Sequence, residues 1–231
     1  MKPKRSHALK WSSNIAYTIG LLTTDGNLSK DGRHIDFTSK DVQLLETFKK
    51  CIGIKNKIGF KISGSSGKKC PHIQFSDVTL YKWLISIGLT PKKSKTIGKL
   101  KIPNKYFFDF LRGHFDGDGS CYGYWDKRWK SSFMFYIKFY SASIKHILWL
   151  RSKIKEFANI SGDLSKNGKT PVYQLKYAKR ESKKLVSKIY YKNRLPCLKR
   201  KYDRLKLIIK TDQIESKTVN ARVEKLANSH A

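Results

Sequence analysis

The apolar and polar residues of the chain follow an order of elements that occurs twice. Each copy opens with an apolar stretch, residues 15–22 and 106–115, which reads as a helix ending at a Gly directly after an Asp. A strand of alternating polarity comes next, at residues 35–39 and 135–141. An amphipathic helix follows each strand, and its apolar face comprises Val42, Leu44, Leu45 and Phe48 in the first copy and Ile144, Ile147, Leu148, Leu150, Ile154 and Phe157 in the second.

The remainder of each copy matches as well. A predicted hairpin turns at residues 63–67 in the first copy and at residues 165–168 in the second, and both hairpins continue with the pattern Pro-x-x-Gln. A second amphipathic helix is predicted at residues 78–87 and 183–191. A basic segment closes each copy, Lys92-Lys93-Ser94-Lys95 in the first and Lys199-Arg200-Lys201 in the second.

The repeat divides the chain into two halves of similar length. The N-terminal half spans residues 1–96, a linker spans residues 97–104, and the C-terminal half spans residues 105–210. Residues 211–231 lie outside the repeat and are expected to form an additional C-terminal helix or a tail.

Two glycines and two aspartates occupy equivalent places in the repeated helices. Gly20 and Gly113 lack side chains, so the two helix backbones could approach closely and bring Asp25 and Asp118 together at one end. That end carries the partial negative charge of unsatisfied helix carbonyls, so the two carboxylates need a compensating cation. A hard divalent ion such as Mg²⁺ suits these oxygen ligands, and nucleic-acid phosphates would complete its coordination. The alternative is that each Asp is an ordinary turn residue, which the repetition disfavours.

The charge of the chain indicates the class of its partner. Lys and Arg total 49 against 17 Asp and Glu in 231 residues, a formal charge of +32, and the excess is spread over both halves. A folded chain this basic favours a polyanion, above all a nucleic acid. The four cysteines form no Cys-x-x-Cys pair, which favours reduced thiols. No apolar run of membrane-spanning length and no secretion signal is found, so an intracellular location with the DNA, in the cytoplasm or an organelle matrix, is expected.

The two helix-ending motifs resemble the paired LAGLIDADG signatures of homing endonucleases, in the single-chain form that carries both copies. Residues 111–120, Leu-Arg-Gly-His-Phe-Asp-Gly-Asp-Gly-Ser, match the signature closely. Residues 18–27 match more loosely, because Thr23 stands where the family has an acid and Thr24 where it has a small residue. The resemblance covers residues 11–210, since the downstream elements also follow the order of the family.

This resemblance implies an α+β fold of two α-β-β-α-β-β-α units related by a pseudo-twofold axis. The motif helices would pack at the interface, and each half would place a saddle-shaped antiparallel sheet along the DNA major groove. In the family, the last acid of each motif binds the catalytic metal ions. The resemblance assigns this role to Asp25 and Asp118, with the backbone carbonyls of Thr24 and Gly117 as further ligands. Mg²⁺ is the expected cofactor, and Mn²⁺ or Ca²⁺ are expected substitutes in binding.

The family also keeps a basic residue near the metal centre of each half. Lys201 matches this position in the second half. In the first half Lys95 is favoured, with Lys93 close behind. A lysine at this place would stabilise the charge that develops on the phosphate. The alternative is that these lysines only contact phosphates.

Side chains at alternate strand positions would face the groove and read the target. The candidates in the first half are Asn27, Ser29, Lys30, Arg33, His34, Asp36, Lys57, Lys61, Ser63, Lys68, Lys69, His72 and Gln74. Those in the second half are Ser120, Tyr122, Tyr124, Lys127, Arg128, Lys130, Tyr136, Lys138, Ser165, Lys166, Asn167, Lys169, Tyr173 and Gln174. Of the positions that can be paired between the halves, only Gln74 and Gln174 agree, so an asymmetric double-stranded DNA target of about two turns is expected. The affinity of the protein for this DNA should fall steeply as the salt concentration rises.

The predicted function is a monomeric, site-specific homing endonuclease that makes a metal-dependent double-strand break by phosphodiester hydrolysis. Such enzymes promote the copying of mobile introns or inteins, and without intein splicing residues this chain is expected to be free-standing. The alternative is an RNA maturase that binds its host intron RNA, or a DNA-binding regulator on the same fold. The two retained acids argue against a purely binding role. A non-enzymatic ribosomal type of RNA-binding protein would explain the charge, but not the repeated Asp-Gly ends.

Overall fold

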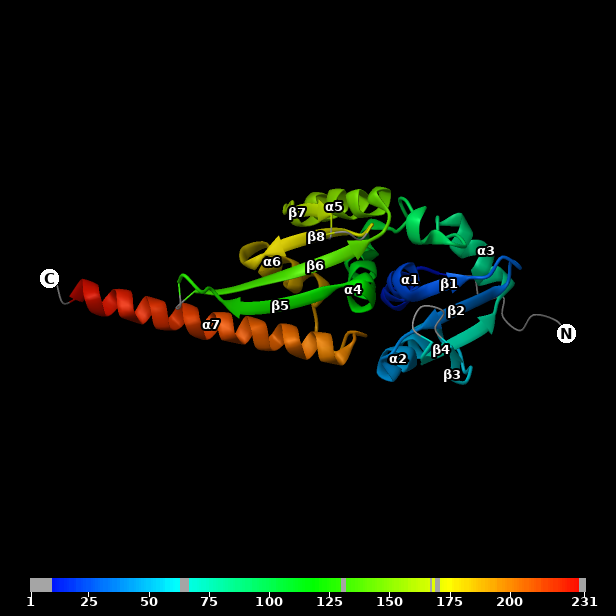
Figure 1. The fold of residues 1–231 in the computed structure, drawn as a ribbon, viewed down its shortest axis with the longest axis horizontal. Helices are drawn as coiled ribbons and strands as arrows, with labels where there is room; N and C mark the ends of the chain where they lie inside the picture. The colour runs from blue at the N-terminus through cyan, green and yellow to red at the C-terminus, as the bar shows by residue number, and fades with distance from the viewer. Residues whose placement is uncertain (1–9, 63–66, 130–131, 167, 169–170, 229–231) are drawn as a thin grey trace.

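The computed structural model of the protein describes residues 10–62, 67–129, 132–166, 168 and 171–228 (Figure 1). The first unit comprises α1 (Ser13–Asp25), β1 (Gly26–Leu28), β2 (His34–Thr38), α2 (Val42–Ile52), β3 (Gly59–Ile62), β4 (Lys69–Ser76) and α3 (Val78–Ser86). The second comprises α4 (Phe107–Asp118), β5 (Ser120–Trp125), β6 (Phe133–Ser141), α5 (Ile144–Ala158), β7 (Asp163–Lys166), β8 (Tyr173–Ala178) and α6 (Lys179–Ile189). Two 3-10 turns, Lys93–Lys95 and Asn104–Tyr106, lie between the units. The last helix, α7 (Lys199–Asn228), follows the second unit.

Each unit builds one four-stranded antiparallel sheet. The strand orders are β1-β2-β4-β3 and β5-β6-β8-β7, so the two units have the same topology. Strand residues alternate between a buried and an open face, as Ile35 and Phe37 of β2 and Ile73 and Phe75 of β4 show by their burial. The expected α+β fold of two α-β-β-α-β-β-α units is confirmed.

The buried apolar residues of the two units form one continuous core. At its centre α1 and α4 pack against each other, with a sheet on either side of the pair (Figure 1). The segment predicted as a linker, residues 97–104, contributes to this core, because Ile97, Leu100 and Ile102 are buried. The connection between the halves is therefore packed against the protein along its length.

The C-terminal part of the chain differs from the expectation. The sequence predicts an additional helix or a tail from residue 211, but α7 already begins at Lys199 and extends well beyond the second sheet (Figure 1). The helix is anchored midway, where the fully buried Asp212 forms an ion pair of 2.6 Å with Lys179, and Glu215 accepts a hydrogen bond from the backbone of Phe133 at 3.0 Å. The basic segment that closes the second copy is thus the first turn of a long helix.

Smaller differences concern the second hairpin and the helix after it. α6 begins at Lys179, four residues before the predicted start, because β8 passes directly into it. Ser165 and Lys166, which the sequence places in a turn, belong to β7. Within the described residues, no helix has both the length and the apolar character needed to span a membrane.

Candidate active site at the crossing of the motif helices

The helices α1 and α4 touch through their backbones. A Cβ atom added to Gly20 would lie 2.6 Å from the backbone nitrogen of His114 and 2.8 Å from Cα of Gly113. One added to Gly113 would overlap the carbonyl of Tyr17 and lie 3.1 Å from Cα of Gly20. The two glycines are therefore the point of closest approach, as the sequence predicts. Both helices end at the same side of the crossing, each directly before a Gly.

Asp25 and Asp118 meet at this common end. Gly117, which directly precedes Asp118, lies against the end of the other helix, and a Cβ atom on it would stand 2.9 Å from Oδ2 of Asp25. Burial, and after it the neighbouring charge of Asp118, raise the pKa of Asp25 to about 7. Burial also raises the pKa of Asp118. The site is therefore a pair of neighbouring carboxylates, one half-buried and one exposed at its surface, whose ionised forms repel each other.

A buried lysine from the first unit flanks the two acids. Lys93 is 7% exposed and donates a hydrogen bond from Nζ to the carbonyl oxygen of Gly26, at the end of α1. Burial lowers the pKa of Lys93 to about 8, although the charges of Asp25 and Asp118 act in the opposite direction. Lys95 is exposed at the far end of the same 3-10 turn. The structure thus favours Lys93 over Lys95 for the basic position of this half.

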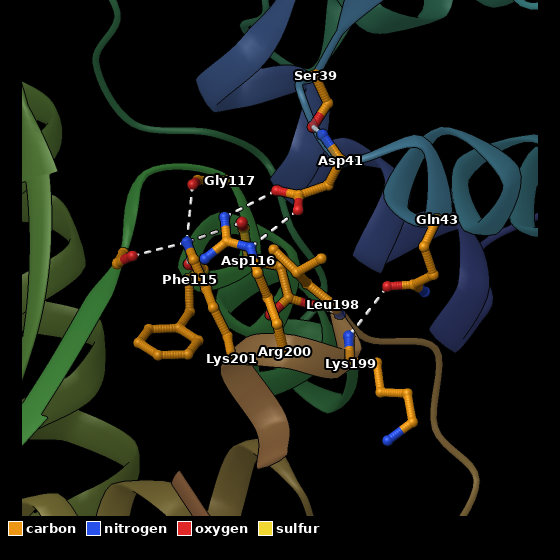
Figure 2. Close-up of polar contacts among 11 residues, drawn as sticks. Ser39, Asp41, Gln43, Phe115, Asp116, Gly117, Leu198, Lys199, Arg200 and Lys201 are labelled. Carbon is orange, nitrogen blue, oxygen red and sulfur yellow. Dashed lines mark hydrogen bonds and ion pairs between the residues drawn. The ribbon is translucent and has the colours of Figure 1, made fainter. Parts of the chain in front are cut away.

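Lys201 occupies the corresponding place in the second unit (Figure 2). Its Nζ donates to the carbonyl oxygens of Phe115, Asp116, Gly117 and Gly119 at 2.6–2.9 Å. A cation at this position offsets the negative end of the α4 dipole. Burial lowers the pKa of this lysine, while the nearby aspartates favour its charged form.

The donors at this end fit a hard divalent cation. Asp25 and Asp118 supply two carboxylates whose repulsion a cation would relieve, and the carbonyls of Thr24 and Gly117 belong to the same helix ends. The Gly117 oxygen accepts from Lys201 at 2.9 Å, which leaves its second lone pair for a metal ion. The described residues contain no cluster of three or more His, Cys, Asp or Glu side chains suited to a metal. Backbone and substrate oxygens would have to complete the coordination.

The carboxylate pair makes the metal-free protein sensitive to pH. Because the pKa of Asp25 rises to about 7 on folding from an ordinary value of 3.8, ionisation of this group opposes folding. We expect Asp25→Asn to raise the free energy of unfolding by about 2–4 kcal/mol near pH 8. The gain should shrink as the pH falls below about 7 and vanish below about pH 3, where the carboxyl is protonated in both states. Urea unfolding in EDTA across this range measures it, and a gain that does not change with pH would contradict the explanation.

Solved structures of LAGLIDADG proteins have the same architecture. I-LtrWI, a LAGLIDADG homing endonuclease bound to target DNA, has a TM-score of 0.57 and 15% identity, over 87% of this chain and 91% of its own. The LAGLIDADG meganuclease I-AabMI, bound to uncleaved DNA, has a TM-score of 0.57 and 16% identity over the same shares. The N-terminal LAGLIDADG domain of DUF199/WhiA has a TM-score of 0.51 and 16% identity, over 82% of this chain and 87% of its own. No protein-family model and no curated protein sequence matches the chain.

The chain has the LAGLIDADG fold. It has this fold in the single-chain form, with one motif helix in each unit, as the sequence predicts. At identities of 16% or less the likeness establishes the architecture only, so the role of the site has to be argued from its own residues.

The two LAGLIDADG motifs differ at the acid that precedes the metal-site aspartate. Asp116 is buried in the second motif and accepts hydrogen bonds from Oη of Tyr17 at 2.8 Å and from the backbone of Leu198 at 2.7 Å. Thr23 stands at this place in the first motif and donates to the carbonyl of Ile19 in its own helix. The departure from the motif therefore removes a cross-helix contact and leaves both candidate metal-site acids in place.

The open face of the first LAGLIDADG sheet carries many of the residues predicted to read DNA. Asn27, Asp36 and Gln74 form one row across β1, β2 and β4. The carboxylate of Asp36 pairs with Nζ of Lys61 and lies 2.6 Å from Nδ1 of His72. These hydrogen bonds and charges lower the pKa of Asp36 against the effect of its burial. Asp36 itself is only 6% exposed, so its carboxylate fixes Lys61 and His72, and Lys61 is the most exposed group of this cluster.

The open face of the second sheet is aromatic and basic. Tyr122 and Tyr136 are cross-strand partners with ring centroids 5.3 Å apart, and Tyr124 stacks 6.2 Å from both. Nζ of Lys138 lies 4.9 Å from the centroid of Tyr122, and that of Lys176 lies 5.4 Å from the centroid of Tyr136. Lys176 was not among the sequence candidates, although it stands two residues after Gln174 and so faces the same side. The two open faces differ in chemistry, which fits an asymmetric target.

Some predicted DNA contacts lie elsewhere. Lys69, Lys166 and Tyr173 alternate onto the opposite face of their sheets, and Tyr173 packs against the core. The candidates in exposed connecting segments are Lys30, Arg33, Lys57, Lys68, Lys127 and Arg128. Four further candidates, Ser63, Lys130, Asn167 and Lys169, lie outside the described residues. Partly exposed positions on or beside the open faces are held by Ser29, His34, Ser120, Ser165 and Gln174.

A basic cavity beside the metal-site end was also not predicted. It has a volume of about 540 Å³ and is lined by Ser120 and Cys121 of β5 and by Arg200, Lys201 and Arg204 of α7. Arg204 could not be found from the repeat, because α7 extends past the last element that the two copies share.

Proposed function

We propose that the protein is a site-specific DNA endonuclease that makes a metal-dependent double-strand break in a long asymmetric target. The observation that carries the proposal is the meeting of Asp25 and Asp118 between the buried lysines Lys93 and Lys201. A site that only bound DNA would gain nothing from two crowded carboxylates, because they repel phosphates. A site that cleaves DNA needs them to hold a cation.

In this proposal the acids and the lysines of the site have separate roles in phosphodiester hydrolysis. Asp25 and Asp118, with the carbonyls of Thr24 and Gly117, would hold Mg²⁺. The bound metal would supply an activated water and stabilise the leaving oxygen. Lys93 and Lys201 place an ammonium group at each of the two helix ends, where it can offset charge that develops on the phosphate. The site has one lysine for each strand of the duplex.

The remaining surface supports double-stranded DNA as the substrate. The net charge of +32 would bind the phosphate backbone, and the open sheet faces present polar and aromatic side chains for base edges. Two of the similar structures are LAGLIDADG nucleases with bound DNA. The competing function is binding alone, either to DNA or to the RNA of a host intron.

Cleavage of a randomised double-stranded DNA library in Mg²⁺ separates these functions. We expect one long asymmetric site to be cut, no cleavage in EDTA, and restored cleavage in Mn²⁺. Sequencing of the cut ends gives the site and the strand positions that are read. Tight binding with no cleavage under any divalent ion would overturn the nuclease, and intron RNA would then be tested as the ligand.

A further inference from the structure

The segment that leads into α7 is fixed first by its own unit. The guanidinium of Arg112, which is fully buried in α4, donates to the carbonyls of Ile189 at 3.0 Å and Pro196 at 2.9 Å. The carboxylate of Asp116 accepts from the backbone nitrogen of Leu198 at 2.7 Å. Both ends of the loop between α6 and α7 are thereby attached to the second motif helix.

The first turn of α2, in the opposite unit, holds the residues that follow (Figure 2). Gln43 donates from Nε2 to the carbonyl of Cys197 at 3.0 Å and accepts at Oε1 from the backbone nitrogen of Lys199 at 3.0 Å. Arg200 donates two parallel hydrogen bonds to Asp41, from Nε at 2.8 Å and from Nη2 at 2.7 Å. Gln43 thus holds the backbone at Cys197 and Lys199, and Asp41 holds the side chain of Arg200, directly before the buried catalytic lysine candidate of the second unit.

These contacts affect the orientation of the chain before Lys201 more than they affect the free energy of folding. The Arg200 side chain is 62% exposed, and exposed ion pairs add little to the free energy of folding. A bidentate pair does restrict orientation, and so does an amide that bridges two backbone groups. Nζ of Lys201 is held by the carbonyls at the end of α4, and the lysine stem reaches them only if the backbone places residue 201 close to this helix end.

The buried lysine of the first unit is held differently. The nearest cross-unit contacts after Lys93 are made by Ser143 Oγ to the carbonyl of Ile97 at 2.5 Å and by Nδ1 of His146, 2.9 Å from the carbonyl of Gly98. These contacts are made to residues four and five positions after Lys93 in the sequence. Ser143 caps α5 where Asp41 caps α2, and a serine cannot form the charged bidentate pair.

We propose that Asp41 and Gln43 are positioning residues for Lys201, so that the first unit controls the lysine that serves one DNA strand. The consequence for cleavage rests on the proposed nuclease function. Within the part of the chain that the structure describes, Lys93 has no equivalent pair of contacts, so loss of Asp41 or Gln43 should slow the cutting of one strand only.

Strand-resolved cleavage of a duplex labelled on each strand tests the proposal. We expect Gln43→Ala and Asp41→Asn to slow cutting of one strand on the order of 10–100-fold, with the other strand within about twofold of wild type. Nicked DNA should accumulate as a result. The charge exchange Asp41→Arg with Arg200→Asp should restore most of the rate. Glu46→Gln is the matched control, since it removes an exposed ion pair with Lys49 from the same helix and should change neither strand. Equal slowing of both strands, or no slowing, would overturn the proposal.

A second measurement does not require cleavage. Reductive methylation followed by mass spectrometry reports the accessibility of individual lysines in the folded protein. We expect Lys201 to be protected in wild type and to react several-fold faster in Gln43→Ala, while Lys93 keeps its wild-type rate. If the wild-type protein cuts no DNA but this difference is found, the nuclease proposal fails and the positioning contact stands. Unchanged protection of Lys201 would overturn the positioning role itself.

Discussion

Replacing Asp118 with asparagine should reduce DNA cleavage by about 10³-fold or more without weakening DNA binding. Asparagine keeps the shape of the side chain and removes the charge that would hold the metal ion at the end of α4. The loss of a negative group from a site that faces phosphates should leave the affinity for DNA equal or slightly higher. Asp25→Asn should behave in the same way, because both acids stand at the same end of the helix pair.

Single-turnover cleavage of a target duplex, together with a binding titration in Ca²⁺, measures the two effects separately. Glu156→Gln is a suitable control, since it removes an exposed acid on α5 that pairs with Lys153. Cleavage by Asp118→Asn at a rate near that of wild type would mean that the carboxylate pair is not the metal site.

The second large effect concerns the helix crossing. We expect Gly113→Ala to lower the free energy of unfolding by about 3 kcal/mol or more. The new methyl group would meet the carbonyl of Tyr17 and the backbone at Gly20, and backbone atoms cannot move aside as a flexible side chain can. The helices would have to separate, and this would also move Asp25 away from Asp118.

Urea unfolding measures the loss, and Gly98→Ala provides a matched control. A Cβ atom at Gly98 would meet no atom within 4 Å, so this alanine should be neutral or stabilise by about 0.4–1 kcal/mol through the unfolded chain. If Gly113→Ala were as stable as Gly98→Ala, the close backbone contact would not exist in solution.

The sequence predicted the architecture because each element carries its own local signal. Alternating apolar residues give strands such as β6, and an Asp followed by Gly ends both motif helices. The duplication then fixed the order of elements without any knowledge of long-range contacts. The same local signals could not assign every groove-facing residue, because a shift of one position reverses the face. Lys69 and Tyr173 were misplaced for this reason.

The site residues that the sequence missed depend on geometry that has no periodic pattern. Lys92 adopts a left-handed backbone conformation with φ of 53°, and the following 3-10 turn buries Lys93 and exposes Lys95. Nothing in the spacing of the basic residues distinguishes these two lysines. The contact of Asp41 with Arg200 joins residues from opposite ends of the chain, and no local pattern connects them.

The single core that runs through both units determines how the protein can be made. While the ribosome is still producing the second unit, the apolar surface of α1 around Gly20 has no α4 to cover it. At 5–20 residues per second, this surface stays open for roughly 4–20 seconds. We therefore expect the nascent first unit to bind chaperones, and slow translation of residues 97–118 to favour aggregation over folding.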